Sequence, residues 1–260
     1  MNVLRMIGVC ALLWGLVGCA SLPTPERVAQ AQTQAQASPP KSPAVRDPRD
    51  PWEPFNRHID RFNQDVDQAV LKPVARTYVQ VVPQPVRTGV RNFFHNLDEI
   101  GTLVSTVLQL KPRAAAETAV RLGVNSTFGL LGVLDLATPM GLERHDEDIG
   151  QALGRWGVGT GPYLVLPLLG PSTLRDTLVR PLDTALDPVQ QVRPRTDRIL
   201  TQGLRVTSQR SRFLGAEAVV QESALDPYTF VRDAYLQKRR SDVFDGEPPS
   251  TFNYDDPDAP

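Results

Sequence analysis

Apolar residues recur at helical spacing along most of the chain, which predicts a series of amphipathic helices. The first such face comprises Phe55, Ile59, Phe62, Val66 and Val70. A short helix is predicted to open at Pro73 and to end before Pro83, because proline fits the first helical turn and disrupts later ones. Further helices are predicted over residues 93–107, from Pro112, over 200–218 and from Pro227. No pair of alternating segments predicts a strand hairpin, so the expected fold is all-α.

The same periodicity predicts which residues face the interior. We expect Ala116, Val120 and Val124 to point inward, and the basic residues of the last helix to be exposed. Those basic residues are Arg232, Lys238, Arg239 and Arg240. Residues 122–142 carry almost no charge and are broken by glycine and proline. This composition fits either a half-buried, interfacial segment or a hairpin of the hydrophobic core.

A glycine-rich stretch precedes a second apolar run. Its glycines are Gly154, Gly157, Gly159 and Gly161, and the run that follows is Tyr163–Leu169. Glycine tolerates backbone conformations and close approaches that other residues do not, so this stretch predicts an adaptable backbone. The run is interrupted by proline and is shorter than the roughly 20 apolar residues that span a bilayer. We expect it to be in the core or to face lipid.

The N-terminus predicts export. Residues 1–18 combine a basic residue with a short apolar core, as a signal peptide does, and end in Leu-Val-Gly before Cys19. This ending resembles a lipobox, which makes Cys19 the expected lipidation site; the alternative is a plain signal peptide with a chance cysteine. Residues 19–49 are rich in Gln, Ala and Pro, which predicts a flexible tether. The helical domain is expected over residues 50–240, followed by an acidic, disordered tail over 241–260.

Motifs for catalysis, metal or cofactor binding are absent from the sequence. The formal net charge of -1 disfavours nucleic-acid binding. His145–Asp148 gathers ligand-type residues, but four consecutive residues cannot close a tetrahedral site alone, so we expect a charged loop or helix end. Asparagines at positions 56, 63, 92, 96 and 125 are expected to be helix caps or buried amides. We therefore expect no enzyme, no catalytic residue, no metal site and no cofactor.

Several motifs, in order, resemble the MlaA/VacJ family of outer-membrane lipoproteins. They are Asp-Pro-Trp-Glu-Pro-Phe-Asn-Arg from Asp50, Val-Pro-Gln-Pro-Val-Arg from Val82, Asn-Phe-Phe-His-Asn-Leu from Asn92, Leu-Gly-Arg-Trp-Gly-Val-Gly-Thr-Gly-Pro-Tyr from Leu153, Leu-Pro-Leu-Leu-Gly-Pro-Ser-Thr-Leu-Arg-Asp to Asp176, and Asp-Pro-Tyr from Asp226. Together they extend over most of the mature chain, from Asp50 to about Tyr235.

The resemblance implies a ring-shaped bundle of amphipathic helices, embedded in the periplasmic leaflet of the outer membrane and lipid-anchored at its periplasmic face. The implied function is removal of mislocalised phospholipid from the outer leaflet through a central polar channel. Implied partners are outer-membrane phospholipids, trimeric porins and a periplasmic phospholipid carrier. By the same resemblance, Gly154, Gly157, Gly159 and Gly161 would form a hinge in the channel wall, and Phe62 and Asn63 a gate.

Two other functions remain open beside the one that the resemblance implies, and the second of them rests on the resemblance too. One is a porin-associated structural lipoprotein that moves no lipid, and the other is a factor in surface spreading or virulence. A polar lining beside the glycines would distinguish transport from a scaffold, because a scaffold does not need one.

Overall fold

The computed structural model describes residues 47–215 and 224–249, and these are mostly helical. The elements are α2 (Glu53–Val66), η2 (Asp67–Leu71), α3 (Lys72–Val81), α4 (Gln84–Leu108), α5 (Pro112–Thr127), α6 (Ile149–Arg155), β1 (Tyr163–Leu166), β2 (Gly170–Thr173), α7 (Leu174–Leu186), η3 (Pro188–Gln191), α8 (Arg195–Ser211) and α10 (Pro227–Val243). The all-α prediction is therefore confirmed. The signal peptide, Cys19 and most of the predicted tether and tail lie outside the described residues.

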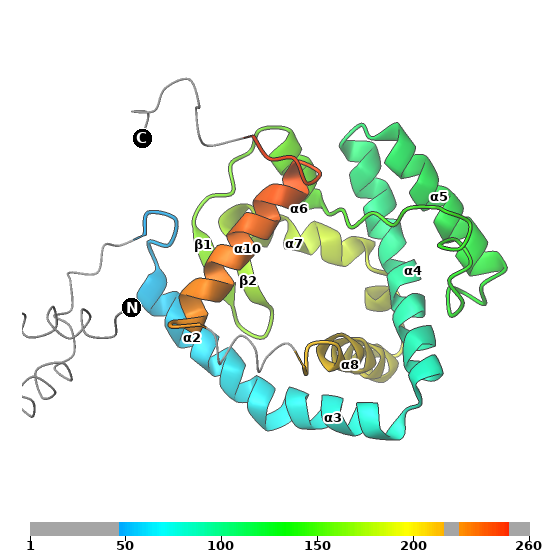
Figure 1. Ribbon diagram of the computed structural model, residues 1–260, viewed down its shortest axis with the longest axis horizontal. Coiled ribbons are helices and arrows are strands. Elements are labelled where there is room, and N and C mark those ends of the chain that lie inside the picture. The colour runs from blue at the N-terminus through cyan, green and yellow to red at the C-terminus, as the bar shows by residue number, and fades with distance from the viewer. Residues whose placement is uncertain (1–46, 216–223, 250–260) are drawn as a thin grey trace, which may run out of the picture. The chain divides into compact units, whose positions relative to one another are not determined.

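Prolines set many of the helix boundaries, as the sequence predicts. Pro85 and Pro112 occupy the first turns of α4 and α5, where no backbone hydrogen bond is lost. The predicted break before Pro73 is absent, because the π-helical segment η2 joins α2 to α3 without interruption (Figure 1). The predicted start of the acidic tail at residue 241 falls inside α10.

A short antiparallel hairpin is the one exception to the helical pattern among the described residues. β1 and β2 pair with Tyr163 opposite Thr173 and Leu166 opposite Gly170. The sequence prediction of no hairpin is wrong here, because each strand has only four residues and no alternation of polar and apolar positions. Positive φ angles of 63° at Leu168 and 78° at Gly170 close the connecting turn.

The hairpin contributes to a small apolar core. Tyr163 and Val165 from β1 pack with Tyr228 from α10, and the rings of Tyr163 and Tyr228 meet edge to face with centroids 6.3 Å apart. Asn56 joins α2 to this core: its amide donates to the Tyr163 carbonyl, and its oxygen accepts from the Val165 amide. The core thus fixes the first and last helices to the hairpin.

Outside this core, buried side chains are often polar and exposed ones often apolar, which is the reverse of the usual arrangement. Among the described residues, more polar and charged side chains than apolar ones are buried. On α5 the buried residues include Thr118, Arg121 and Asn125, whereas the predicted inward residues Ala116 and Val120 are exposed. The prediction for this helix was wrong because buried partners satisfy its polar face: Arg121 pairs with Glu99, and Asn125 accepts from the loop that follows the helix.

The uncharged stretch, residues 122–142, also turns apolar side chains outward. Phe128, Leu130 and Leu131 have exposed fractions of 74%, 68% and 66%, so this segment is not the core hairpin that was one of the alternatives. Buried amides hold it in place: Asn125 accepts from the amides of Leu136 and Ala137, and Asn96 donates to Leu131. No helix among the described residues has the length and apolar character required to cross a membrane.

Candidate functional site

A polar cavity of about 700 Å³ lies among helices α4, α6, α7, α8 and α10. Its charged lining residues are Asp98, Arg144, Asp146, Glu147, Asp148, Asp176, Arg180, Asp183, Asp187, Arg205, Lys238, Arg239 and Asp242. The lining residues thus come from segments that extend from Leu97 to Asp242 along the chain. A cavity with both signs of charge can accept a zwitterionic or charged headgroup.

One wall of this cavity is a buried ion-pair network centred on Arg239. Its guanidinium donates to Asp148 at 2.6 and 2.7 Å and to Asp176 at 2.8 Å. Burial alone would raise the pKa of both carboxyls, and the hydrogen bonds and charge of Arg239 lower each pKa below its ordinary value. Asp148 also caps α6 by accepting from the Gln151 amide at 2.8 Å. The network therefore ties α6, α7 and α10 together.

Two of the basic residues predicted to be exposed are buried. Arg239 lies in the network above, and Arg232 is 6% exposed, with Asp47 at 3.1 Å. The prediction for these two was wrong because acidic partners from distant segments compensate the buried charges. No sequence spacing indicated this pairing, although Asp176 ends one of the motifs quoted above and Asp148 ends the His145–Asp148 cluster.

The opposite side of the cavity carries Arg205 of α8. Arg205 pairs with Asp187 at 2.8 Å and with Asp98, and its guanidinium lies over the Phe94 ring at 5.8 Å. Burial raises the pKa of Asp98 to about 6, although Arg205 opposes the shift. The cavity therefore becomes less negative as the pH falls through about 6.

Three donors in the lining have unused capacity. The buried Arg144 Nε and Gln202 Nε2 atoms have no hydrogen-bond partner among the described residues, and Arg180 forms no ion pair there. Unsatisfied buried donors are uncommon in native proteins, and a phosphate or carbonyl oxygen satisfies such groups. The cavity thus offers donors for oxygen atoms of a ligand beside its carboxylates.

The predicted hinge glycines lie beside this cavity wall, not among its lining residues. Gly154 is in α6, where a Cβ would lie 2.6 Å from Arg175 Nη1 and 2.8 Å from Val243 Cγ2. Gly157 has a φ of +89°, and a Cβ on Gly161 would approach Leu174 to 3.1 Å. Gly157 and Gly159 are exposed, with no neighbour within 4 Å of a built Cβ. Gly154, Gly157 and Gly161 thus each have a structural reason for glycine, Gly159 has none, and hinge motion stays a prediction.

The predicted gate residues lie on α2, against the hairpin. The Asn63 amide donates to the Leu166 carbonyl at 2.9 Å, and its oxygen accepts from the Leu168 amide at 2.7 Å. Phe62 is 45% exposed and belongs to the outward apolar surface. Neither residue lines the polar cavity. Asn63 can therefore act on the cavity only through the hairpin, and the gate role stays a prediction.

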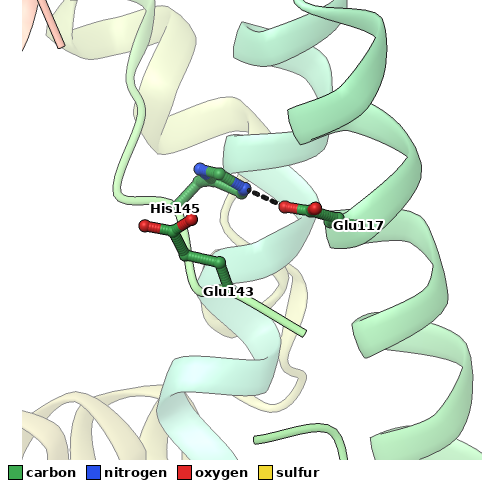
Figure 2. A group of neighbouring side chains, drawn as sticks. All are labelled: Glu117, Glu143 and His145. Atoms are coloured by element: carbon green, nitrogen blue, oxygen red, sulfur yellow. Dashed lines mark hydrogen bonds and ion pairs between the residues drawn. The ribbon is translucent and has the colours of Figure 1, made fainter. Parts of the chain in front are cut away.

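A separate cluster could hold a metal ion. Glu117 of α5 and Glu143 and His145 of the extended segment before α6 have ligand atoms within 4.8 Å of one another (Figure 2). His145 Nε2 lies 2.8 Å from Glu117 Oε2, and Arg113 donates to the other Glu117 oxygen at 3.0 Å. Because Arg113 already neutralises Glu117, this geometry is also that of an ordinary ion-pair cluster. The predicted charged helix end is confirmed for Asp148, the N-cap of α6.

The hinge prediction can be tested at one glycine without backbone strain. Valine at position 157 would be strained by the positive φ, whereas Gly159 has neither a positive φ nor a close neighbour. We expect Gly159→Val to unfold at the same temperature as the unmodified protein and to be slower in the phospholipid clearance that the resemblance implies. Circular dichroism and phospholipase accessibility measure the two effects. Normal clearance by this variant would exclude a hinge at Gly159.

Comparison with known proteins places the chain in a family. Residues 48–242 match the family described as MlaA lipoprotein. The "Intermembrane phospholipid transport system lipoprotein MlaA" of Shigella flexneri is 35% identical, covering 73% of this chain and 76% of that protein. The protein of the same name from Escherichia coli K12 is 34% identical over the same shares. An uncharacterised protein of Rickettsia bellii is 33% identical, over 75% of this chain and 76% of that protein.

A solved structure agrees with these matches. It is described as "Structural basis for maintenance of bacterial outer membrane lipid asymmetry", and it superposes with a TM-score of 0.65 at 32% identity. The match covers 75% of this chain and 98% of that chain. The chain belongs to the MlaA lipoprotein family.

Proposed function

We propose that this protein is an outer-membrane lipoprotein that removes mislocalised phospholipid from the outer leaflet. The lipid passes through the polar cavity to a periplasmic phospholipid carrier, and the protein catalyses no covalent chemistry. The observation that carries the proposal is the inverted polarity, with a polar cavity inside and apolar side chains outside. The names of the relatives, which include intermembrane phospholipid transport, support the same function.

The apolar exterior supports partial embedding in a membrane leaflet. Large exposed apolar patches mark interaction sites because water disfavours them. The loop with Phe128, Leu130 and Leu131 and the outer faces of α2 and α7 carry such residues, including Phe55 and Leu178. Non-helical backbone at membrane depth requires internal hydrogen bonds, and Asn96 and Asn125 provide them for this loop. The same apolar surface could contact a trimeric porin.

The polar cavity lowers the barrier to headgroup movement. A charged group in bare hydrocarbon is costly, and a lining with charges of both signs replaces part of its hydration. Arg180, with Arg144 Nε and Gln202 Nε2, can bind phosphate oxygens, while the carboxylates can bind an ammonium group. A purely structural lipoprotein has no need for such a cavity, which favours transport over a scaffold.

The proposal also includes how the protein is anchored to the membrane and how the lipid leaves it. Acylation at Cys19, outside the described residues, would tether the protein to the periplasmic face, since two or more acyl chains give stable attachment. α10 and the acidic tail after it are candidates for the carrier contact. Phe62 and Asn63 are the proposed gate against uncontrolled flow, and Asn63 would act by holding the hairpin against α2.

Deletion of the gene tests the proposal. We expect intact cells without this protein to expose more phospholipid to added phospholipase than cells that contain it, because outer-leaflet lipid is no longer removed. Re-expression should reverse the rise, and the Cys19→Ala variant should fail to do so. An unchanged outer leaflet after deletion, with the protein still bound to porin in normal cells, would favour the scaffold instead.

A further inference from the structure

A second cavity, of about 790 Å³, differs from the first in being almost entirely apolar. It lies between the N-terminal half of α4, η3 and α8, and no charged residue lines it. Val90, Phe93 and Phe94 of α4 form one wall, and Val189 and Leu204 lie opposite. Thr201 is the single polar side chain of its lining. The chemistry of this cavity suits hydrocarbon.

The apolar cavity adjoins the polar one. Leu97 lines both cavities, and Arg205, which lines the polar cavity, lies over the ring of Phe94, which lines the apolar one. On α8 the consecutive residues Leu204 and Arg205 line the apolar and polar cavities respectively. The lining therefore changes from apolar to charged within about one residue, as the surface of a bound amphipathic molecule does.

The extent of the apolar lining along α4 matches that of an acyl chain. Its lining on α4 runs from Pro85 to Leu97, which at about 1.5 Å per residue measures roughly 18 Å. Half of the hydrocarbon core of a bilayer, the depth that the acyl chains of one leaflet occupy, is about 15 Å. The charged lining begins at Asp98, one residue beyond this apolar stretch.

We propose that the apolar cavity receives an acyl chain of the phospholipid whose headgroup occupies the polar cavity, with Leu97 at the boundary. This proposal rests on the proposed function, and it adds that the substrate is held at both ends. A lipid bound in this way exposes less of its tail while the headgroup crosses the protein. The absence of charge in the apolar cavity disfavours a charged peptide as its occupant.

Photolabelling of the purified full-length lipoprotein in detergent tests the proposal. One phosphatidylethanolamine probe carries a diazirine in its acyl chain, and a second carries it on the headgroup. We expect the acyl probe to label residues 84–97 and 188–204, and the headgroup probe to label the lining of the polar cavity. Val90→Trp, and separately Thr201→Trp, should lower acyl labelling about tenfold by filling the space, because the displaced methylenes lose their apolar contacts.

Val120→Trp is the matched control. Val120 is also a helical valine, but it is exposed on α5 and lines neither cavity. Acyl labelling that is spread evenly over exposed apolar surfaces, and that neither cavity variant reduces, would overturn the acyl site. If the headgroup probe still labels the polar cavity in that case, the proposed function stands. Failure of both probes to label the protein would contradict the acyl site and the proposed function together.

Discussion

Replacing Arg239 with methionine is expected to lower the free energy of unfolding by about 3 kcal/mol, since it leaves buried carboxylates without their main partner. Asp148 and Asp176 would lose the charge that keeps each pKa low, while Arg175 would still pair with Asp176 at 3.0 Å. Because Asp176 retains Arg175, we place the loss at the lower end of the range for broken buried pairs. Denaturant unfolding of purified protein in detergent measures it.

The neighbouring residue provides the control. Lys238 pairs only with Asp242 among the described residues, and its side chain is 73% exposed. Lys238→Met should therefore cost less than about 1 kcal/mol. Adding Asp148→Asn and Asp176→Asn to the Arg239→Met variant should recover part of the loss, because the unpaired charges are removed. Equal unfolding of the Arg239 and Lys238 variants would show that the network does not stabilise the fold.

The helices of this protein were predictable because their signals are local. Prolines in the first turns of α4 and α5 mark where helices begin, and Asp226 caps α10 by accepting from the Tyr228 amide. The buried amides were also predicted in kind, and Asn56 and Asn125 confirm them. These features depend on a few adjacent residues and on the chemistry of one side chain.

The orientation of the helices was not predictable from periodicity alone. An amphipathic pattern has two faces, and the usual rule assigns the apolar one to the interior. On α5 that rule buries Val120, yet Arg121 is the buried residue, paired with Glu99 at 3.0 Å. The periodicity is the same whichever face is buried, so the partners on neighbouring elements, here Glu99 for Arg121, decide which face turns inward.

The polar cavity lay beyond sequence reasoning for a different reason. Asp98, Arg180 and Arg205 come from three helices separated by long stretches of chain, and none lies in a recognisable binding motif. The resemblance directed attention to Gly154–Gly161 instead, which flank the wall. Only the packing of α4, α7 and α8 brings the lining residues together.

Blocking the polar cavity should abolish lipid removal without unfolding the protein. Gly101 of α4 lines the cavity, and a Cβ built there meets no atom within 4 Å. Gly101→Trp therefore places an indole in the cavity without displacing its neighbours at Cβ. Replacing a glycine within a helix also removes its unfavourable helix propensity, about 1 kcal/mol relative to alanine. We expect outer-leaflet phospholipid to rise to the level of the deletion strain.

Gly123 offers a matched control for this variant. It too lies within a helix, α5, with no atom within 4 Å of a built Cβ, but it does not line the cavity. Gly123→Trp adds the same side chain at an exposed position, so general effects of the indole on folding or membrane insertion appear in both variants. Clearance should be lost only with Gly101→Trp.

The most direct test is therefore the phospholipase-accessible phospholipid of intact cells whose only copy of the protein carries Gly101→Trp or Gly123→Trp, at equal protein levels. The account predicts deletion-like accumulation in the first strain and normal clearance in the second. Normal clearance in the Gly101→Trp strain would contradict passage of phospholipid through the polar cavity.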